Sequence, residues 1–178
     1  MAASTTGAIV LVGPMGSGKT SIGRRVAREL KVSFTDTDSL VTREHGPIPA
    51  IFAADGEARF REFERAAVRE ALQSGGVVAL GGGAVLDEET RRDLAEHNVI
   101  LLMVSPQTVR TRIHGEARPL LTQGEDPIAR WEAILEQRRP LYDAVADLTI
   151  DTSTGPLAGV VTEIVSWVRA AHLVEEDA

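Results

Sequence analysis

Gly13-Pro14-Met15-Gly16-Ser17-Gly18-Lys19-Thr20 follows the apolar run Ala8–Val12 and precedes a stretch with helical spacing. The eight residues fit G-x-x-x-x-G-K-S/T, the pattern of a phosphate-binding loop. The glycines let the backbone curl so that successive N–H groups point at phosphate oxygens, and the following helix directs the positive end of its dipole there. Lys19 is expected to reach the β- and γ-phosphates and Thr20 to ligate Mg²⁺. The stretch therefore predicts a nucleoside triphosphate as the ligand.

The rest of the chain alternates apolar runs with amphipathic stretches. The runs expected to be strands are Ala8–Val12, Val32–Thr35, Val77–Leu80, Val99–Val104 and Leu148–Ile150. The stretches expected to be helices are Ser21–Leu30, Glu57–Leu72, Asp87–Glu96, one that begins near Pro106, Ile128–Arg139 and Leu157–Ala171. The helix at Ile128 is expected to stop at Pro140, because proline breaks the helical hydrogen-bond ladder. The alternation predicts an α/β fold, a three-layer sandwich in which helices flank a five-stranded parallel sheet.

No linker, repeat or low-complexity tract divides the chain, so we expect one domain over residues 1–178. Ligands of such sheets bind outside the carboxyl ends of the strands. The phosphate loop 13–20 and an acceptor-binding region at about 36–64, a small helical insertion, both fall at such ends. Residues 115–126 contain two glycines and a proline without periodicity and are expected to form a mobile lid.

The composition excludes several classes of protein. The net charge of -7 argues against a protein that coats nucleic acid. The chain has no cysteine, which excludes disulfides, thiolate catalysis and cysteine-ligated metal sites. The opening MAASTTGAIV lacks the regions of a signal peptide, and no apolar run has the length of a membrane span. We expect a cytoplasmic monomer whose partner is a small molecule, with no nucleic acid or membrane involved.

Two classes of phosphate-loop protein remain, a guanine-nucleotide switch and a small-molecule kinase. A switch normally reads guanine with N-K-x-D. The only lysines are Lys19 and Lys31, and Leu30 precedes Lys31, so that motif is absent. A kinase needs an acceptor site near the γ-phosphate, positive charge for the transition state and a means of excluding water. The sequence favours the kinase because it has candidates for all three.

Two aspartates close the second expected strand as Asp36-Thr37-Asp38. In an extended segment residues two apart project to the same side, so both carboxylates would face the cleft. One can hold water on Mg²⁺ while the other accepts a hydrogen bond from a substrate hydroxyl. The alternative is that the pair caps a helix beginning at Ser39.

Further candidates lie on the next helix and after the third strand. Arg61 and Glu64 are three residues apart on the helix, so Glu64 can fix a guanidinium suited to a carboxylate; the alternative is a solvated surface pair. Gly81-Gly82-Gly83 follows a buried strand and permits close approach of the backbone to a ligand; the alternative is a plain flexible turn.

Two arginine sites complete the set. Arg118 lies in the expected lid, where it could cover the phosphates and stabilise developing charge. Arg138 and Arg139 precede Pro140-Leu141-Tyr142. An arginine at the end of a helix is often only a partner of the helix dipole, which is the alternative for this pair.

Together these motifs resemble shikimate kinase over nearly the whole chain. The resemblance rests on G-P-M-G-S-G-K-T, D-T-D, I-F-x-x-x-G-E-x-x-F-R-x-x-E, L-G-G-G-A-V, R-P-L-L and R-x-P-L-Y, in matching order and spacing. It implies transfer of the γ-phosphate of ATP to the 3-hydroxyl of shikimate, with Mg²⁺, in aromatic amino-acid synthesis. Gluconate kinases share the scaffold and would also suit a clamp for a small hydroxy acid, so a gluconate kinase and a non-catalytic nucleotide-binding module remain alternatives.

The resemblance also implies roles for residues. The residues that would hold ATP are Gly13 to Thr20, Ser21, the lid residue Arg118, and Arg110 or Arg112 at adenine with the loop Asp151–Pro156. Thr20 would ligate Mg²⁺ directly, with Asp36 in its outer shell. Lys19 and Arg118 would bridge nucleotide and acceptor, and Asp38 would hold the acceptor hydroxyl and serve as its base.

On the acceptor side, Arg61 and Arg138 would clamp the shikimate carboxylate together with the backbone around Gly82. Gly81 and Gly83 would complete that wall. Phe52 and Phe60 would line the acceptor ring. One departure from the family pattern is the stretch Gly46–Phe52, which is short and carries two prolines. Because proline removes backbone donors, we expect the helix that enters the acceptor region to begin late, which puts the placement of Phe52 in doubt.

Overall fold

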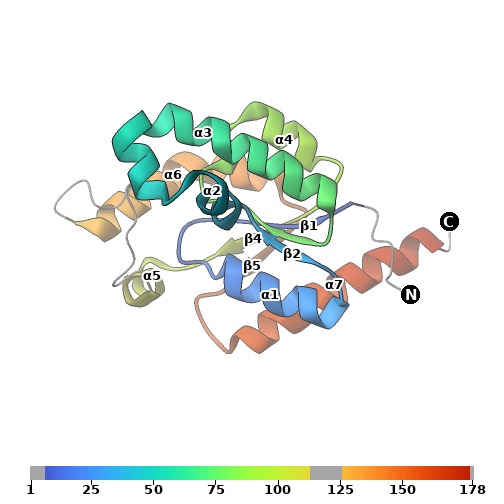
Figure 1. Cartoon of the computed structure of the whole chain (residues 1–178). Helices are drawn as coiled ribbons and strands as arrows, with labels where there is room; N and C mark the ends of the chain where they lie inside the picture. Colours follow the sequence, from blue (N-terminus) through green and yellow to red (C-terminus); the bar gives the residue numbers. More distant parts are fainter. Residues whose placement is uncertain (1–6, 113–125, 177–178) are drawn as a thin grey trace.

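The computed structural model describes residues 7–112 and 126–176, with side chains up to residue 171. Its sheet has the strand order β2-β3-β1-β4-β5, and all four pairings are parallel (Figure 1). The strands are β1 (Ile9–Val12), β2 (Phe34–Asp36), β3 (Val77–Ala79), β4 (Asn98–Met103) and β5 (Leu148–Asp151). The helices are α1 (Lys19–Leu30), α2 (Thr37–His45), α3 (Ile48–Ser74), the short 3₁₀ turn η1 (Ala84–Leu86), α4 (Glu88–Leu94), α5 (Pro106–Arg112), α6 (Pro127–Val145) and α7 (Leu157–Glu176).

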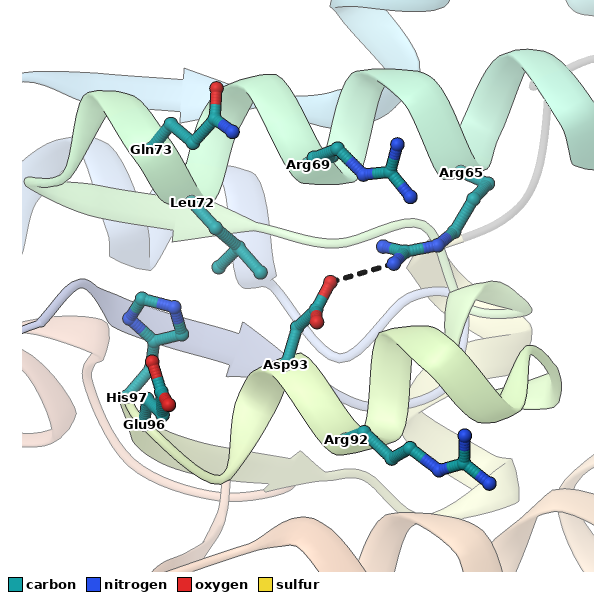
Figure 2. Close-up of a pocket in the computed structure, with 8 residues that line it drawn as sticks. All are labelled: Arg65, Arg69, Leu72, Gln73, Arg92, Asp93, Glu96 and His97. Atoms are coloured by element: carbon teal, nitrogen blue, oxygen red, sulfur yellow. Dashed lines mark hydrogen bonds and ion pairs between the residues drawn. The ribbon is translucent and has the colours of Figure 1, made fainter.

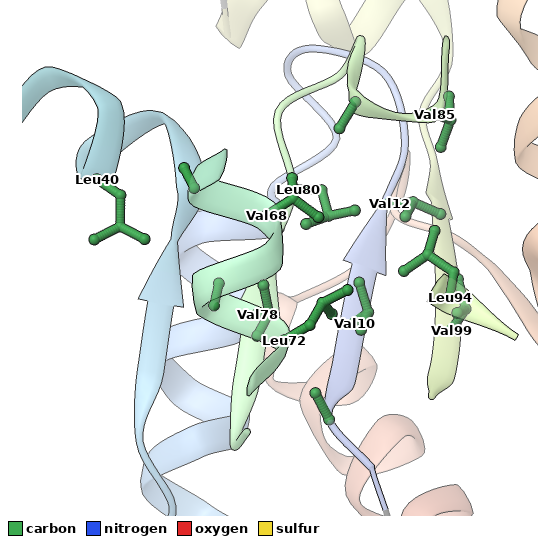
Figure 3. Close-up of a cluster of buried hydrophobic side chains, with 14 of the residues drawn as sticks. Val10, Val12, Leu40, Val68, Leu72, Val78, Leu80, Val85, Leu94 and Val99 are labelled. Carbon is green, nitrogen blue, oxygen red and sulfur yellow. The ribbon is translucent and has the colours of Figure 1, made fainter. Parts of the chain in front are cut away.

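Two apolar layers enclose the sheet, and the predicted three-layer α/β fold is confirmed. Successive residues of β1 point to opposite faces. Val10 and Val12 join the cluster under α3 and α4, where Val68, Leu72 and Leu94 meet them (Figure 3). The odd-numbered residues of β1 join a second cluster with α1 and α7 on the other face. Burial on both faces explains why this strand is a continuous apolar run.

The topology places the ligand loops at one edge of the sheet. The chain leaves β1 for α1 on one face, and it leaves β3 for α4 on the other (Figure 1). β1 and β3 are neighbours, with Leu11 paired to Ala79. Where loops after adjacent parallel strands part in this way, a crevice opens at the carboxyl ends of the strands. The loops after β1, β2 and β3 therefore meet there.

α6 corrects one prediction. The helix was expected to stop at Pro140, but it runs on to Val145 with Pro140 inside it. A proline in a helix interior costs about 3 kcal/mol. Arg138 and Tyr142, two residues before and two residues after Pro140, are both buried, so packing of the last turns offsets that cost.

α3 begins at Ile48, directly after Pro47, and its backbone leaves helical geometry at Gly56, where φ is 82°. The helix predicted from Glu57 is thus its second segment. Pro49 lies in the first turn of the first segment, where its missing N–H has no helical partner to lose. The expectation of a late start is therefore wrong: the two prolines open the helix and do not delay it, and Phe52 lies within its first segment.

α3 is tied to α4 by an ion pair. Figure 2 shows Arg65 of α3 reaching Asp93 of α4, with 2.7 Å between Nη2 and Oδ2. Asp87 and Glu89 lie 3.4 and 3.5 Å from Nε of the same guanidinium. The hollow of about 470 Å³ beside them lies between two helices, away from the phosphate loop. This cavity lies beside the ion pairs that hold α3, the helix with Arg61, against α4.

Among the described residues, no helix is both long and apolar enough to cross a membrane.

Candidate active site

A cavity of about 330 Å³ opens where the three loops meet. Three groups of residues line it: Met15, Gly16, Gly18, Lys19, Thr20 and Ser21 from the phosphate loop and α1; Asp36, Asp38, Leu80, Gly81 and Gly82 from the loops after β2 and β3; and Arg112 and Leu157. The cavity thus joins the predicted nucleotide loop to the predicted acceptor wall.

The phosphate loop has the backbone that its glycines predict. Gly13, Gly16 and Gly18 all have positive φ, a region that L side chains rarely adopt. α1 starts at Lys19, and Gly18 has no side chain to cap it. The first N–H groups of α1 are therefore open to an anion. Nζ of Lys19 donates to the carbonyl oxygens of Gly13 and Pro14, at 2.8 and 2.9 Å, which folds the lysine over the loop.

The next three carbonyl groups of the loop accept hydrogen bonds from distant elements. Nε1 of Trp131 donates to Met15 at 2.9 Å, Nη1 of Arg112 to Gly16 at 2.9 Å, and Oγ1 of Thr152 to Ser17 at 2.8 Å. With its carbonyl groups held outward, the loop keeps its N–H groups for a ligand. The sequence alone did not indicate these donor roles of the buried Trp131 and Thr152.

The aspartates after β2 correct a second prediction. Asp36 ends β2, but Thr37 and Asp38 are already helical, so the segment is not extended. Oδ1 of Asp36 accepts from the N–H of Ser39 at 3.0 Å, so the capping alternative is confirmed for Asp36. Its other oxygen accepts from Oγ1 of Thr20 at 2.6 Å. Both aspartates still line the cavity, because the first turn of α2 faces it.

Two of the three glycines after β3, Gly81 and Gly83, lie so close to charged side chains that close approach rather than positive φ requires glycine there. A Cβ atom on Gly81 would lie 2.6 Å from Oδ1 of Asp38 and 2.7 Å from Oε1 of Glu64. One on Gly83 would overlap the guanidinium of Arg61. The N–H of Gly81 donates to Oγ1 of the buried Thr37 at 3.0 Å, which ties this wall to α2.

Arg61 and Glu64 form the predicted pair, with 2.7 Å between Nη1 and Oε2. Glu64 is only 4% exposed, so the solvated-pair alternative fails. Burial by itself lowers the pKa of Arg61, but the charge and hydrogen bonds of Glu64 and Glu57 outweigh it and raise the pKa. Burial raises the pKa of Glu64, and Asp38 nearby acts in the same direction, while Arg61 opposes both. The guanidinium is therefore charged and rigidly held.

Arg138 is buried on α6 and faces the same wall. A Cβ atom on Gly82 would lie 3.6 Å from Nη1 of Arg138, 3.7 Å from the Tyr142 hydroxyl and 3.6 Å from the carbonyl oxygen of Gly13. Tyr142 donates its hydroxyl hydrogen to the carbonyl oxygen of Gly82 and is hydrogen-bonded to Arg138. Burial raises the pKa of Tyr142 to about 12, so it stays a donor. Nε of Arg138 has no hydrogen-bond partner among the described residues.

The other residues predicted for the site are two phenylalanines and three arginines, and only some of them lie at the cavity. The rings of Phe52 and Phe60 are 5.0 Å apart, and the guanidinium of Arg61 lies 5.2 Å from the Phe60 centroid. Phe60 belongs to the core cluster and Phe52 packs against it. Of the two arginines considered for adenine, Arg112 lines the cavity, whereas Arg110 is exposed on α5. Arg118 and nearly all of the predicted lid lie outside the described residues.

Known proteins are similar to this chain in both sequence and fold. The shikimate kinase family model matches residues 15–169. A shikimate kinase of Rhodococcus erythropolis is 45% identical over 163 residues, which cover 90% of this chain and 96% of that protein. The structure of a shikimate kinase from Acinetobacter baumannii in complex with shikimate superposes with a TM-score of 0.88 at 35% identity, over 94% of this chain and 95% of that one.

A gluconokinase structure is also similar to this chain, but less so than the shikimate kinase structure. A gluconokinase from Sinorhizobium meliloti superposes with a TM-score of 0.64 at 22% identity, over 98% of both chains. That likeness extends to the fold alone. Because the family model spans most of the chain and the relative of 45% identity aligns over 90% of it, the chain belongs to the shikimate kinase family.

Proposed function

We propose that this protein transfers the γ-phosphate of ATP to the 3-hydroxyl of shikimate. The observation that carries the proposal is the position of Gly82, where a Cβ atom would lie 3.6 Å both from the Gly13 carbonyl oxygen of the phosphate loop and from Nη1 of the buried Arg138. A phosphate site and a carboxylate site therefore share one wall. The family relative that was solved with shikimate bound supports the choice of acceptor.

The nucleotide half of the site follows from the phosphate loop. The open N–H groups at the start of α1 would bind the phosphates, and Lys19 would turn from the loop carbonyls to the β- and γ-phosphates. Arg112, held by the carbonyl groups of Gly16 and Thr152, would border the base. Arg118 stays the predicted lid residue that stabilises charge on the phosphoryl group in transfer.

Mg²⁺ fits the oxygen donors beside the loop. Thr20 and Asp36 share a hydrogen bond of 2.6 Å at the edge of the cavity. A hydroxyl and a carboxylate are the hard oxygen donors that this ion prefers. Thr20 would bind the ion directly and Asp36 through water. Bound there, the ion would neutralise charge on the β- and γ-phosphates.

The acceptor half uses the charges along the glycine wall. Arg61 and Arg138 would hold the shikimate carboxylate, since guanidinium forks match carboxylate geometry. Asp38 would accept the proton of the 3-hydroxyl while that oxygen forms a bond to the γ-phosphorus and the bond to the β-phosphate oxygen breaks. The ring of Phe60 would pack against the guanidinium of Arg61, and Phe52 would border the acceptor ring.

An acceptor-dependence assay tests the proposal. The protein is incubated with MgATP and either shikimate, gluconate or no acceptor, and the release of ADP is followed. Shikimate should raise ADP release by orders of magnitude, and gluconate should leave it at the level without acceptor. Equal release with and without shikimate would reject the proposal, and release with gluconate alone would select the alternative kinase.

A further inference from the structure

One face of α6 contacts both halves of the site. Trp131, Arg138 and Tyr142 are separated by seven and four residues, close to two turns and one turn of an α-helix, so they share that face. Trp131 donates to the phosphate loop at Met15, and Tyr142 donates to the acceptor wall at Gly82. We infer that Trp131 is a positioning residue, which holds the phosphate loop in register with the acceptor wall through α6.

The surroundings of Trp131 fix its indole firmly. The side chain is 1% exposed and packs in a cluster with Val104, Val109, Ile128 and Ile134. The side chain of Met15 packs against the same cluster, so the loop residue is held by its carbonyl group and by its side chain. A donor so constrained restricts the carbonyl group of Met15 to one orientation.

The hydrogen bond from Trp131 to Met15 differs from the hydrogen bonds at the two neighbouring carbonyl groups of the loop. Arg112 and Thr152 hold the neighbouring carbonyl groups from α5 and from the residue after β5. The bond at Met15 is the one that comes from the helix carrying Arg138. Without it the loop would populate conformations that do not bind phosphates, and apparent nucleotide affinity falls in proportion to the lost population. The acceptor wall keeps its own contacts with Tyr142.

Removal of the N–H group alone gives the sharpest test. In a Trp167→Phe background, the remaining tryptophan can be replaced by benzothienylalanine, which has nearly the same shape but sulfur in place of N–H. The matched control is the same background with natural tryptophan at position 131. Trp167, on α7, packs against the opposite cluster and has no place in the site. A second variant, Trp131→Phe, also removes the donor and needs no modified amino acid.

Binding of MgADP and of shikimate is measured separately by calorimetry. The inference rests on the proposed function, but MgADP binding is independent of the acceptor, so the two can fail separately. We expect MgADP to bind about tenfold more weakly without the N–H group, because an unsatisfied buried acceptor lets the loop relax. Shikimate affinity should change less than twofold.

The other results would overturn the inference. Unchanged MgADP affinity with a lower melting temperature would mean that Trp131 only packs. An equal loss of affinity for both ligands would mean that the change acts on the whole fold rather than on the phosphate loop. A tenfold loss for MgADP alone, in both variants, supports positioning.

Discussion

The α-carbon of Gly81 lies against the carboxylate of Asp38, so that a Cβ atom on residue 81 would come within 2.6 Å of Oδ1. The same atom would lie 2.7 Å from Oε1 of Glu64, the partner of Arg61. The wall is therefore shaped by the side chains that it faces. The proposed base and the proposed clamp both depend on the missing side chain at this position.

Gly81→Ala should displace Asp38 and lower kcat/KM by about 100-fold, since a shift of about 1 Å in a catalytic group has an effect of that size. Steady-state kinetics and a melting curve measure the effect on activity and on the fold. Gly159→Ala is the matched control: that glycine lies in α7 with open space around it, so the same change should leave activity unaltered. Near-normal activity of Gly81→Ala would contradict the close contact.

Arg138→Ala should weaken shikimate binding far more than MgADP binding. Removal of one partner from a buried charged pair costs on the order of 2–5 kcal/mol, so KM for shikimate should rise about 30-fold or more. The neighbouring Arg139 is half exposed and pairs with Asp143 at 3.0 Å, so Arg139→Ala should change KM little. Arg138→Lys keeps the charge if the alanine variant fails to fold. Equal losses for shikimate and MgADP would disprove the assigned role.

Asp36→Asn should raise the Mg²⁺ concentration needed for half-maximal activity, because the carboxylate proposed for the outer shell of the ion loses its charge. Asparagine is as good an N-cap as aspartate, so α2 should keep its start. Asp87 caps α4 through the N–H of Thr90 at 2.7 Å, which makes Asp87→Asn the matched control. A titration of activity with Mg²⁺ checks this. Identical curves for Asp36→Asn and Asp87→Asn would show that Asp36 does not take part in Mg²⁺ binding.

His97 should make stability depend on pH. Its Nδ1 accepts from the N–H of Ala8 at 2.9 Å, and burial lowers the pKa of His97 below its ordinary 6.5. The unfolded chain then binds the proton more readily than the native one. The contribution of His97 is thus complete above pH 6.5 and is lost as the pH falls from there towards the native pKa.

Urea unfolding at about pH 7.5 and about pH 5.5 tests this dependence. His97→Asn keeps an oxygen that can accept from Ala8 but does not titrate. The wild type should lose more unfolding free energy than the variant between the two pH values. Parallel losses in the two proteins would show that His97 does not titrate differently on unfolding.

The sequence predicted the parts of the site whose signal is local. The phosphate loop is specified by glycines and one lysine within eight residues, and the three central strands β3, β1 and β4 by continuous apolar runs. The Arg61–Glu64 pair follows from helical spacing, and its contact is confirmed. The helix expected over Asp87–Glu96 is likewise present as α4 (Glu88–Leu94), with Asp87 as its N-cap.

The sequence could not predict features that depend on contacts between distant elements. α6 continues through Pro140 because its last turns are buried, which no local propensity records. Asp38 faces the cavity from a helix, where the pattern suggested a strand. Trp131 and Thr152 contact the phosphate loop from 116 and 135 residues away in the chain. The sequence shows that such a residue has a polar group, but it does not show which distant carbonyl group that donor reaches.

Identification of the phosphorylated product tests the proposed reaction most directly. The protein is incubated with MgATP and shikimate until the nucleotide is consumed, and the product is examined by phosphorus and proton NMR. We predict one new phosphate ester, equimolar with ADP, whose phosphorus couples to the proton on C3 of shikimate. A phosphate on another hydroxyl, or ADP formed together with free inorganic phosphate and no ester, would contradict the assignment.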